Sequence, residues 1–187
     1  MIITITGKPC SGKGTVSKLF CKEYNFDYIC TGDMFREIAK TYGYDNVLDF
    51  QKDERVKTVD YQIDNNTKQI GIERANEDLV IDSRLAWHFV PNSYKVFIDV
   101  SWDVAGERLF NAKRETEQVT SIKQATNKLI DRWNEENSRY KEIYNTNNLN
   151  PNNYDLIILS DNKSPEEIVL EIFKNYQIFI KKAQKKH

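Results

Sequence analysis

The sequence contains few cysteines, no excess of charge of either sign and no long apolar run. Its three cysteines, Cys10, Cys21 and Cys30, form an odd, unspaced set that shows no zinc pattern and suits a reducing cytoplasm. No stretch approaches the roughly 18 apolar residues of a membrane span, and the first residues have the pattern of a core strand, so we expect neither a span nor a signal peptide. Lys and Arg number 27 against 28 Asp and Glu, so we expect no general nucleic-acid-binding surface.

Strand-like and helix-like patterns alternate along the 187 residues, which suffice for one domain with a single core. The strand-like segments are short and apolar, and they fall at about 1–6, 28–30, 79–82, 94–100 and 154–159. Helical patterns fall at about 16–24, 33–42, 56–76, 102–113 and 122–144, and a last helix starts at Ser164-Pro165-Glu166-Glu167. The alternation predicts an α/β fold whose parallel five-stranded sheet is flanked by helices.

A glycine-rich segment lies between the first strand and the first helix. It reads Gly7-Lys8-Pro9-Cys10-Ser11-Gly12-Lys13-Gly14-Thr15. In this position, backbone N–H groups and the positive end of the helix dipole surround an anion, and the glycines let the backbone come close to it. The ammonium of Lys13 can reach the β- and γ-phosphates of a nucleotide. We therefore expect this phosphate loop to bind a nucleoside triphosphate.

A set of arginines stands at strand ends or on helices that could face one cleft. Its members are Arg36, Arg84, Arg108, Arg114, Arg132 and Arg139. In open α/β sheets ligands bind at the carboxyl ends of the strands. Guanidinium groups are planar, permanently charged and bidentate toward phosphate, which suits a reaction that gathers several phosphate charges. Each arginine alone would be a surface residue, but their joint placement predicts phosphoryl transfer between two phosphorylated molecules.

These segments resemble those of nucleoside monophosphate kinases over nearly the whole chain. The Gly-Thr pair after Lys13 resembles the phosphate loop of the adenylate-kinase branch of P-loop proteins. Residues 31–37 resemble the start of the monophosphate-binding helix in adenylate and cytidylate kinases. Residues 80–86, Val80-Ile81-Asp82-Ser83-Arg84-Leu85-Ala86, and the helix that carries Arg132, Glu136 and Arg139-Tyr140 are similar to the short, archaeal-type cytidylate kinases.

The resemblance implies one P-loop kinase domain over residues 1–187, with a monophosphate-binding region at about 31–76 and a short lid at about 111–121. It implies transfer of the γ-phosphoryl group of ATP to CMP or dCMP with the help of Mg²⁺. The phosphate loop would hold the donor. The acceptor would contact Thr31, Arg36, Arg84 and Glu136, and closure around the transferring group would involve Arg108, Arg114, Arg132 and Arg139.

Two features depart from the usual patterns. Gly14 follows Lys13 where the general motif has a hydroxyl, which arrives one residue later at Thr15, so its contact with Mg²⁺ is either direct or through water. We expect Asp82 to orient the waters of the same metal ion. Trp133 and Asn134 stand where the cytidylate-kinase branch usually has charged residues.

The base-binding residues are less clearly marked. Asp60 and Asp64 lie four residues apart on one predicted helix face, and either carboxylate can accept a hydrogen bond from the amine of cytosine. The alternative is that both are solvated beside nearby lysines. Tyr44 and Phe50 either wall the base pocket or belong to a core or to the surface, and we expect His88 to be structural.

We expect a cytoplasmic monomer that acts on small nucleotides. Two other functions fit the same motifs. One is a P-loop kinase for another acceptor, such as AMP, UMP, a nucleoside or a sugar acid. The other is a nucleotide-dependent assembly factor that reuses the fold without catalysis, although such a factor has no need for ligands of an acceptor phosphate.

Overall fold

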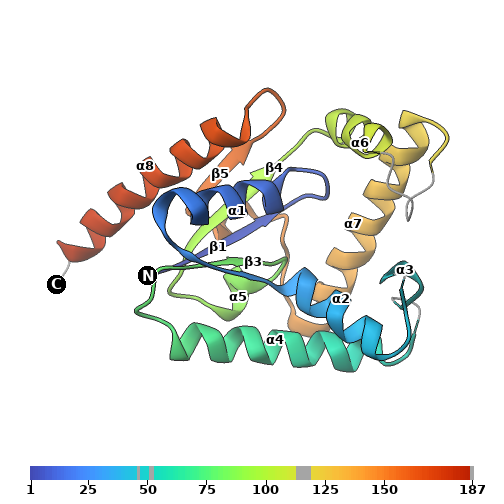
Figure 1. The fold of residues 1–187 in the computed structure, drawn as a ribbon, viewed down its shortest axis with the longest axis horizontal. Helices are drawn as coiled ribbons and strands as arrows, with labels where there is room; N and C mark the ends of the chain where they lie inside the picture. The colour runs from blue at the N-terminus through green and yellow to red at the C-terminus, as the bar shows by residue number, and fades with distance from the viewer. Residues whose placement is uncertain (46, 51–52, 113–118, 186–187) are drawn as a thin grey trace.

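The computed structural model describes residues 1–45, 47–50, 53–112 and 119–185. Within these ranges, parallel strands form one five-stranded sheet with the order β2-β3-β1-β4-β5. The strands are β1 (Ile2–Gly7), β2 (Asp27–Cys30), β3 (Leu79–Asp82), β4 (Tyr94–Asp99) and β5 (Leu156–Leu159). The predicted α/β architecture with a parallel sheet is confirmed (Figure 1).

The helices occupy the segments between the strands. They are α1 (Lys13–Tyr24), α2 (Thr31–Thr41), α3 (Val47–Phe50), α4 (Val56–Glu73), α5 (Ala86–Phe89), α6 (Trp102–Asn111), α7 (Ile122–Tyr144) and α8 (Pro165–Gln184), with a short 3₁₀ helix at Pro151–Asn153. The bounds of α7 are those predicted, and Ser164 caps α8 in a full capping box. The short helices α3 and α5 and the 3₁₀ turn were not predicted, because three or four residues show no hydrophobic period.

The central strands β1 and β3 are buried on both faces, as is usual for parallel strands. Ile3 and Ile5 point to one face, where they pack in a cluster with residues of α1 and α8. Ile2 points to the opposite face, where it packs with Ala86 of α5 and Ile70 of α4. Figure 1 shows α1 and α8 on one side of the sheet and α4 and α5 on the other.

Helices α2, α3 and α4 form a separate small core. Its buried members are Ala39, Phe50, Val56, Val59 and Ile63. Phe50 is fully buried there, and the hydroxyl of Tyr44 donates a hydrogen bond to Asp53 at 2.7 Å. Of the predicted roles for Tyr44 and Phe50, the core role is therefore the observed one, and neither residue lines the cleft described below.

The carboxyl ends of the strands point toward α2, α6 and α7 (Figure 1). The phosphate loop follows β1, α2 follows β2, and the segment 83–85 follows β3, so three sequence-distant segments meet at this edge. Among the helices in the described ranges, none is long and apolar enough to cross a membrane.

Candidate active site

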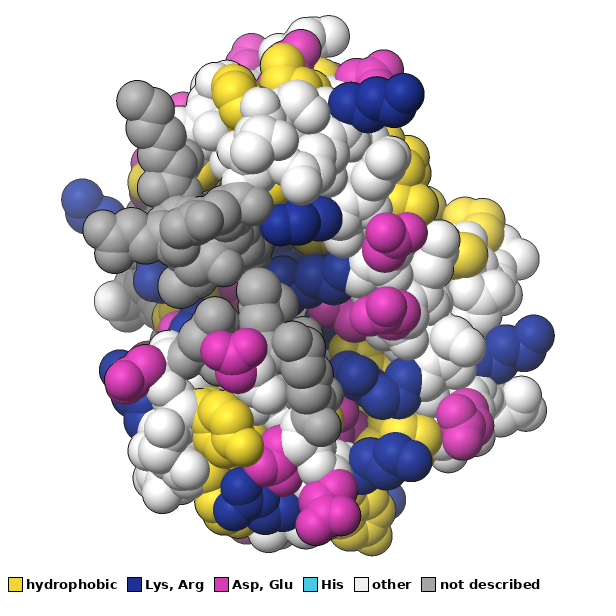
Figure 2. Space-filling model, turned by 90° about the vertical axis from the view of Figure 1, so that its right-hand side faces the viewer, with side chains coloured by type: hydrophobic (Ala, Val, Ile, Leu, Met, Phe, Trp, Pro, Cys, Tyr) yellow, Lys and Arg dark blue, Asp and Glu magenta, His cyan; other side chains and the backbone are white. Residues whose placement is uncertain are grey.

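A cleft of about 460 Å³ opens at the carboxyl edge of the sheet. Its wall consists of the phosphate loop, the start of α2, the turn after β3, and the facing sides of α4 and α7. Figure 2 looks at this side of the molecule and shows Lys and Arg side chains gathered around its central hollow. A concave site that converges several cations is suited to a ligand with more than one phosphate group.

The phosphate loop has the backbone geometry that anion binding requires. A Cβ atom on Gly7 would lie 2.4 Å from the carbonyl oxygen of Ile98, so only glycine allows β1 to end this close to β4. Gly12 adopts a left-handed φ of 85°, and no side chain caps the N-terminus of α1. The first N–H groups of α1 are therefore left for a ligand.

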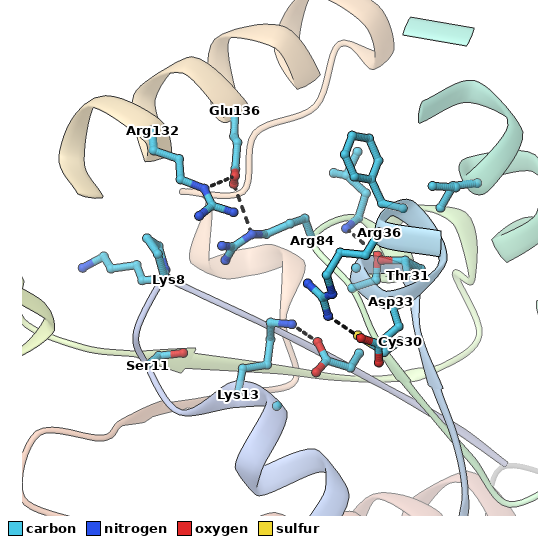
Figure 3. A pocket seen from close by; sticks show the side chains of 18 of the residues that line it. Lys8, Ser11, Lys13, Cys30, Thr31, Asp33, Arg36, Arg84, Arg132 and Glu136 are labelled. Atoms are coloured by element: carbon cyan, nitrogen blue, oxygen red, sulfur yellow. Dashed lines mark hydrogen bonds and ion pairs between the residues drawn. The ribbon is translucent and has the colours of Figure 1, made fainter. Parts of the chain in front are cut away.

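Lys13 and Asp82 form an ion pair at the centre of the cleft (Figure 3). Asp82 is only 2% exposed, and its Oδ2 accepts a hydrogen bond from the Tyr28 hydroxyl at 3.2 Å. Burial, and after it the nearby Arg84 guanidinium, lower the pKa of Lys13 to about 7, against smaller raising effects of Cys30 and Glu136. Without a nucleotide, Lys13 thus has a carboxylate in place of a phosphate as its partner.

Glu136 joins two arginines of the predicted set (Figure 3). Its carboxylate oxygens lie 3.1 Å from Nε of Arg84 and 3.0 Å from Nε of Arg132. Burial acts to raise the pKa of Glu136, but the two guanidinium groups outweigh it, so the pKa lies below its ordinary value. The charged Glu136 therefore holds Arg84 and Arg132 next to one another before any phosphate arrives.

Other predicted acceptor residues lie at the rim of the same cleft. Thr31 is the first residue of α2, and Arg36, one turn later, forms an ion pair with Asp33. Arg139 faces Asp60 across the cleft, with 3.4 Å between Nε and Oδ2. The structure thus brings together Arg36, Arg84, Arg132 and Arg139.

Arg108 does not join this group. Its guanidinium donates to the carbonyl oxygen of Cys10 at 3.1 Å and to that of Ser160 at 2.8 Å, and it does not line the cleft. It braces the phosphate loop from outside because the α6 register points it at the loop backbone. Arg114 and most of the predicted lid lie outside the described residues; Asn111 ends α6, and Ser121 caps α7.

Lys8 belongs to the cleft wall, but its charge is directed away from the donor position. Its ammonium lies 2.7 Å from Oδ1 of Asp99, donates to the carbonyl of Val100 and sits 4.9 Å from the ring centre of Trp102. Lys8 therefore ties the loop to the end of β4. The sequence motif does not tell in which direction the side chains of Lys8 and Lys13 point, because that direction depends on the neighbouring strand.

Asp60 and Asp64 are partly buried carboxylates on the cleft side of α4, not solvated ones. Asp64 accepts a hydrogen bond from the hydroxyl of Tyr144. Burial, and to a smaller extent the charge of Asp60, raise the pKa of Asp64 to about 6. Their contact with a base stays a prediction, but the solvated alternative is wrong.

Tyr28 lines the cleft but was not predicted as a site residue. It lies on the strand before the predicted acceptor helix, where it alternates with Cys30.

The oxygen atoms near Lys13 suit a magnesium ion that would be bound mainly through the phosphates of the substrate. The Oδ1 atom of Asp82 is buried and pairs with the Lys13 ammonium, and Thr15 lies in the same cleft wall. Within the described part of the chain, no cluster of three His, Cys, Asp or Glu side chains could hold a metal by itself. Mg²⁺ commonly uses one or two carboxylates together with phosphate oxygens and water.

The ionisation of Asp64 is expected to destabilise the unliganded protein. Its folded-state pKa of about 6 exceeds the ordinary 3.8, so the folded state holds the proton more tightly and loses stability as the pH rises between these values. Asp64→Asn, which can still accept from Tyr144, should raise the free energy of unfolding by about 1–2 kcal/mol at pH 7.5 and by much less at pH 4. Urea unfolding at both pH values measures this effect.

The exposed Asp131 provides the control for this measurement, since Asp131→Asn should change the stability little at either pH. An Asp64→Asn gain that is equally large at pH 4 and pH 7.5 would contradict the argument.

Comparison with known proteins agrees with the geometry of the cleft. The family model described as the cytidylate kinase-like family matches residues 2–162. A cytidylate kinase of Methanococcus aeolicus is 35% identical over 86% of this chain and 88% of its own length. That of Methanocaldococcus jannaschii is 35% identical over 84% and 87%, respectively.

A solved shikimate kinase from Bacteroides thetaiotaomicron has a TM-score of 0.65 at 18% identity and covers 97% of this chain and 98% of its own. This likeness concerns the fold, whereas the family match and the identities concern the whole cleft-forming segment. The chain therefore belongs to the cytidylate kinase-like family and is a phosphotransferase of the nucleoside monophosphate kinase type.

Proposed function

We propose that the protein transfers the γ-phosphoryl group of ATP to the 5′-phosphate of CMP or dCMP. One observation carries this proposal: a phosphate loop faces four arginines and two partly buried carboxylates across one cleft. The loop suits a nucleoside triphosphate, the arginines suit a second phosphate, and the carboxylates suit a base with an amine. The family match supports cytidine as the nucleoside.

On the donor side, the loop amides and Lys13 would bind the β- and γ-phosphates. The phosphates would replace Asp82 as the partner of Lys13, which leaves the carboxylate of Asp82 available for another cation. When bound, Mg²⁺ would neutralise charge on the phosphates, and Asp82 and Thr15 are the residues placed to hold it.

On the acceptor side, Arg36 and Arg84 would bind the monophosphate, and Arg132 and Arg139 would lie near the transferred group. No general base is needed, because the acceptor phosphate is already largely ionised at neutral pH. Catalysis then consists of positioning two phosphates and stabilising the charge between them. Closure around the transferring group would keep water away from the donor.

Asp60 and Asp64 would select cytosine over uracil. Cytosine presents an exocyclic amine, which donates to a carboxylate, whereas uracil presents a carbonyl oxygen at the same position. A uracil oxygen facing a partly buried carboxylate would be repelled by it and would find no donor there, which is costly. Each carboxylate already has one partner, Arg139 for Asp60 and the Tyr144 hydroxyl for Asp64, so a base amine would share a carboxylate with that partner.

The arginine set also bears on the other candidate functions. Arg84 and Arg132 are held together around Glu136 in the absence of ligand, so the cleft is prepared for a second phosphate. A nucleoside or a sugar acid has no phosphate to offer there. A binding factor without catalysis would not need these ligands.

A coupled assay of ATP with CMP, dCMP, UMP and AMP tests the proposal. We expect turnover with CMP or dCMP to exceed that with UMP and AMP, and Lys13→Met to reduce it at least a hundredfold, about 3 kcal/mol of transition-state stabilisation. Faster turnover on a non-nucleotide, or a Lys13→Met enzyme with more than a tenth of the wild-type kcat, would refute it.

Arg36→Ala separates the acceptor side from the donor side. Arg36 is exposed, and the ion pair it forms among the described residues is the local one with Asp33, so its removal should leave the fold unchanged. We expect kcat/KM for CMP to fall by about tenfold to a hundredfold, because a charge-assisted contact with phosphate is lost, while ATP affinity changes less than twofold. Separate titrations with CMP and ATP check this, and equal losses would place Arg36 on the wrong side.

A further inference from the structure

Arg84 is more tightly enclosed than an ordinary surface arginine. Its Nη1 donates to the carbonyl of Gly7, its Nε lies 3.1 Å from Glu136, and its Cζ lies 5.6 Å from the ring centre of Trp133. The Arg84 side chain is 21% exposed, whereas that of Arg36 is 54% exposed. The guanidinium is therefore held by a carbonyl of the phosphate loop and by a carboxylate and an aromatic ring of α7.

Trp133 is fixed by the core on the side that does not meet Arg84. It is only 2% exposed, and its ring centre lies 6.3 Å from that of Phe97 in an edge contact. It stands three residues before Glu136, so the ring and the carboxylate project from the same side of α7. A cation near the face of a buried indole is attracted by the ring quadrupole, more strongly than in water.

The aromatic character of residue 133 matters at this position. A charged side chain at this depth would need its own partner and would compete for Glu136 or repel Arg84. An indole supplies attraction and bulk without either conflict. The indole thus favours one orientation of Arg84 over the many rotamers of a long side chain.

We propose that Trp133 is a positioning residue that orients the Arg84 guanidinium for the phosphate of the acceptor nucleotide. The inference rests on the proposed function, in which Arg84 binds that phosphate. Trp133 itself does not touch the substrate. Its effect is confined to the part of the binding free energy that comes from the phosphate, because base and donor contacts lie elsewhere.

Calorimetric titration of the protein with CMP and with cytidine isolates the contribution of the phosphate to the binding free energy. The ratio of the cytidine Kd to the CMP Kd measures what the phosphate contributes. We expect Trp133→Leu to reduce this ratio threefold to tenfold, and Trp133→Phe, which keeps an aromatic face, to leave it within twofold of wild type. ATP affinity should stay within twofold in both variants. Trp133→Met replaces Trp133→Leu if the latter fails to fold.

Trp87→Leu is the matched control, because Trp87 is also buried but packs against Tyr154 and bonds to Asn148 outside the cleft. It should leave the ratio unchanged. The proposal is overturned if Trp133→Leu (or Met) keeps the wild-type ratio, or if the Phe variant loses as much as the aliphatic one.

Two further titrations separate this proposal from the proposed function. Repeating the ratio with UMP against uridine and AMP against adenosine identifies the base that the wild type prefers, and the Trp133 effect is then read on that nucleotide. Arg84→Ala should abolish most of the phosphate contribution. If it does not, Arg84 is not the phosphate ligand, and the positioning role fails with it.

Discussion

Two buried carboxylates hold together the cations of the cleft. Lys13, Arg84 and Arg132 would repel one another in a site that water only partly reaches, yet Asp82 and Glu136 lie between them. Each carboxylate is itself expensive to bury without a partner, so the cations and the carboxylates stabilise each other's positions. The cleft is thereby formed before a nucleotide enters it.

The same arrangement makes the cleft responsive to phosphate. A polyphosphate offers Lys13 a stronger partner than the single carboxylate of Asp82, and an acceptor phosphate can share Arg84 and Arg132 with Glu136. In the proposed reaction, these ion pairs would give way to contacts with the two phosphate groups. The same reasoning applies to the base. Burial raises the pKa values of Asp60 and Asp64, and a hydrogen-bond donor from the ligand would relieve the cost of burying these carboxylates.

The phosphate loop depends on support from outside the cleft. Arg108 holds the carbonyl of Cys10, and Lys8 is anchored to Asp99 at the end of β4. Both cations pair with groups that support the loop, and the predicted part of each in nucleotide binding or catalysis stays a prediction. A basic residue in or near a phosphate motif can thus shape the loop as well as bind a ligand.

The sequence by itself determined the alternation of strands and helices, the phosphate loop and the family. These features depend on local patterns: β-branched runs for the strands, glycines before a lysine for the loop, and the Ser-Pro-Glu-Glu start for α8. The predicted strands and helices also placed Arg36 and Arg84 near strand ends and Arg132 on the long helix α7. Short helices such as α5 have no such pattern and were missed.

Only the tertiary structure decided which cations face the ligand and which brace the loop. Arg108 and Lys8 differ from Arg84 and Lys13 through partners that are far away in the chain, such as Ser160 and Asp99. The burial of Asp64 and the ring of Trp133 beside Arg84 likewise arise from the packing of α7 against α4 and the sheet. The composition and spacing of a sequence do not specify where its side chains point. In a packed fold, that direction decides which charges are neutralised by neighbours and which remain for the substrate.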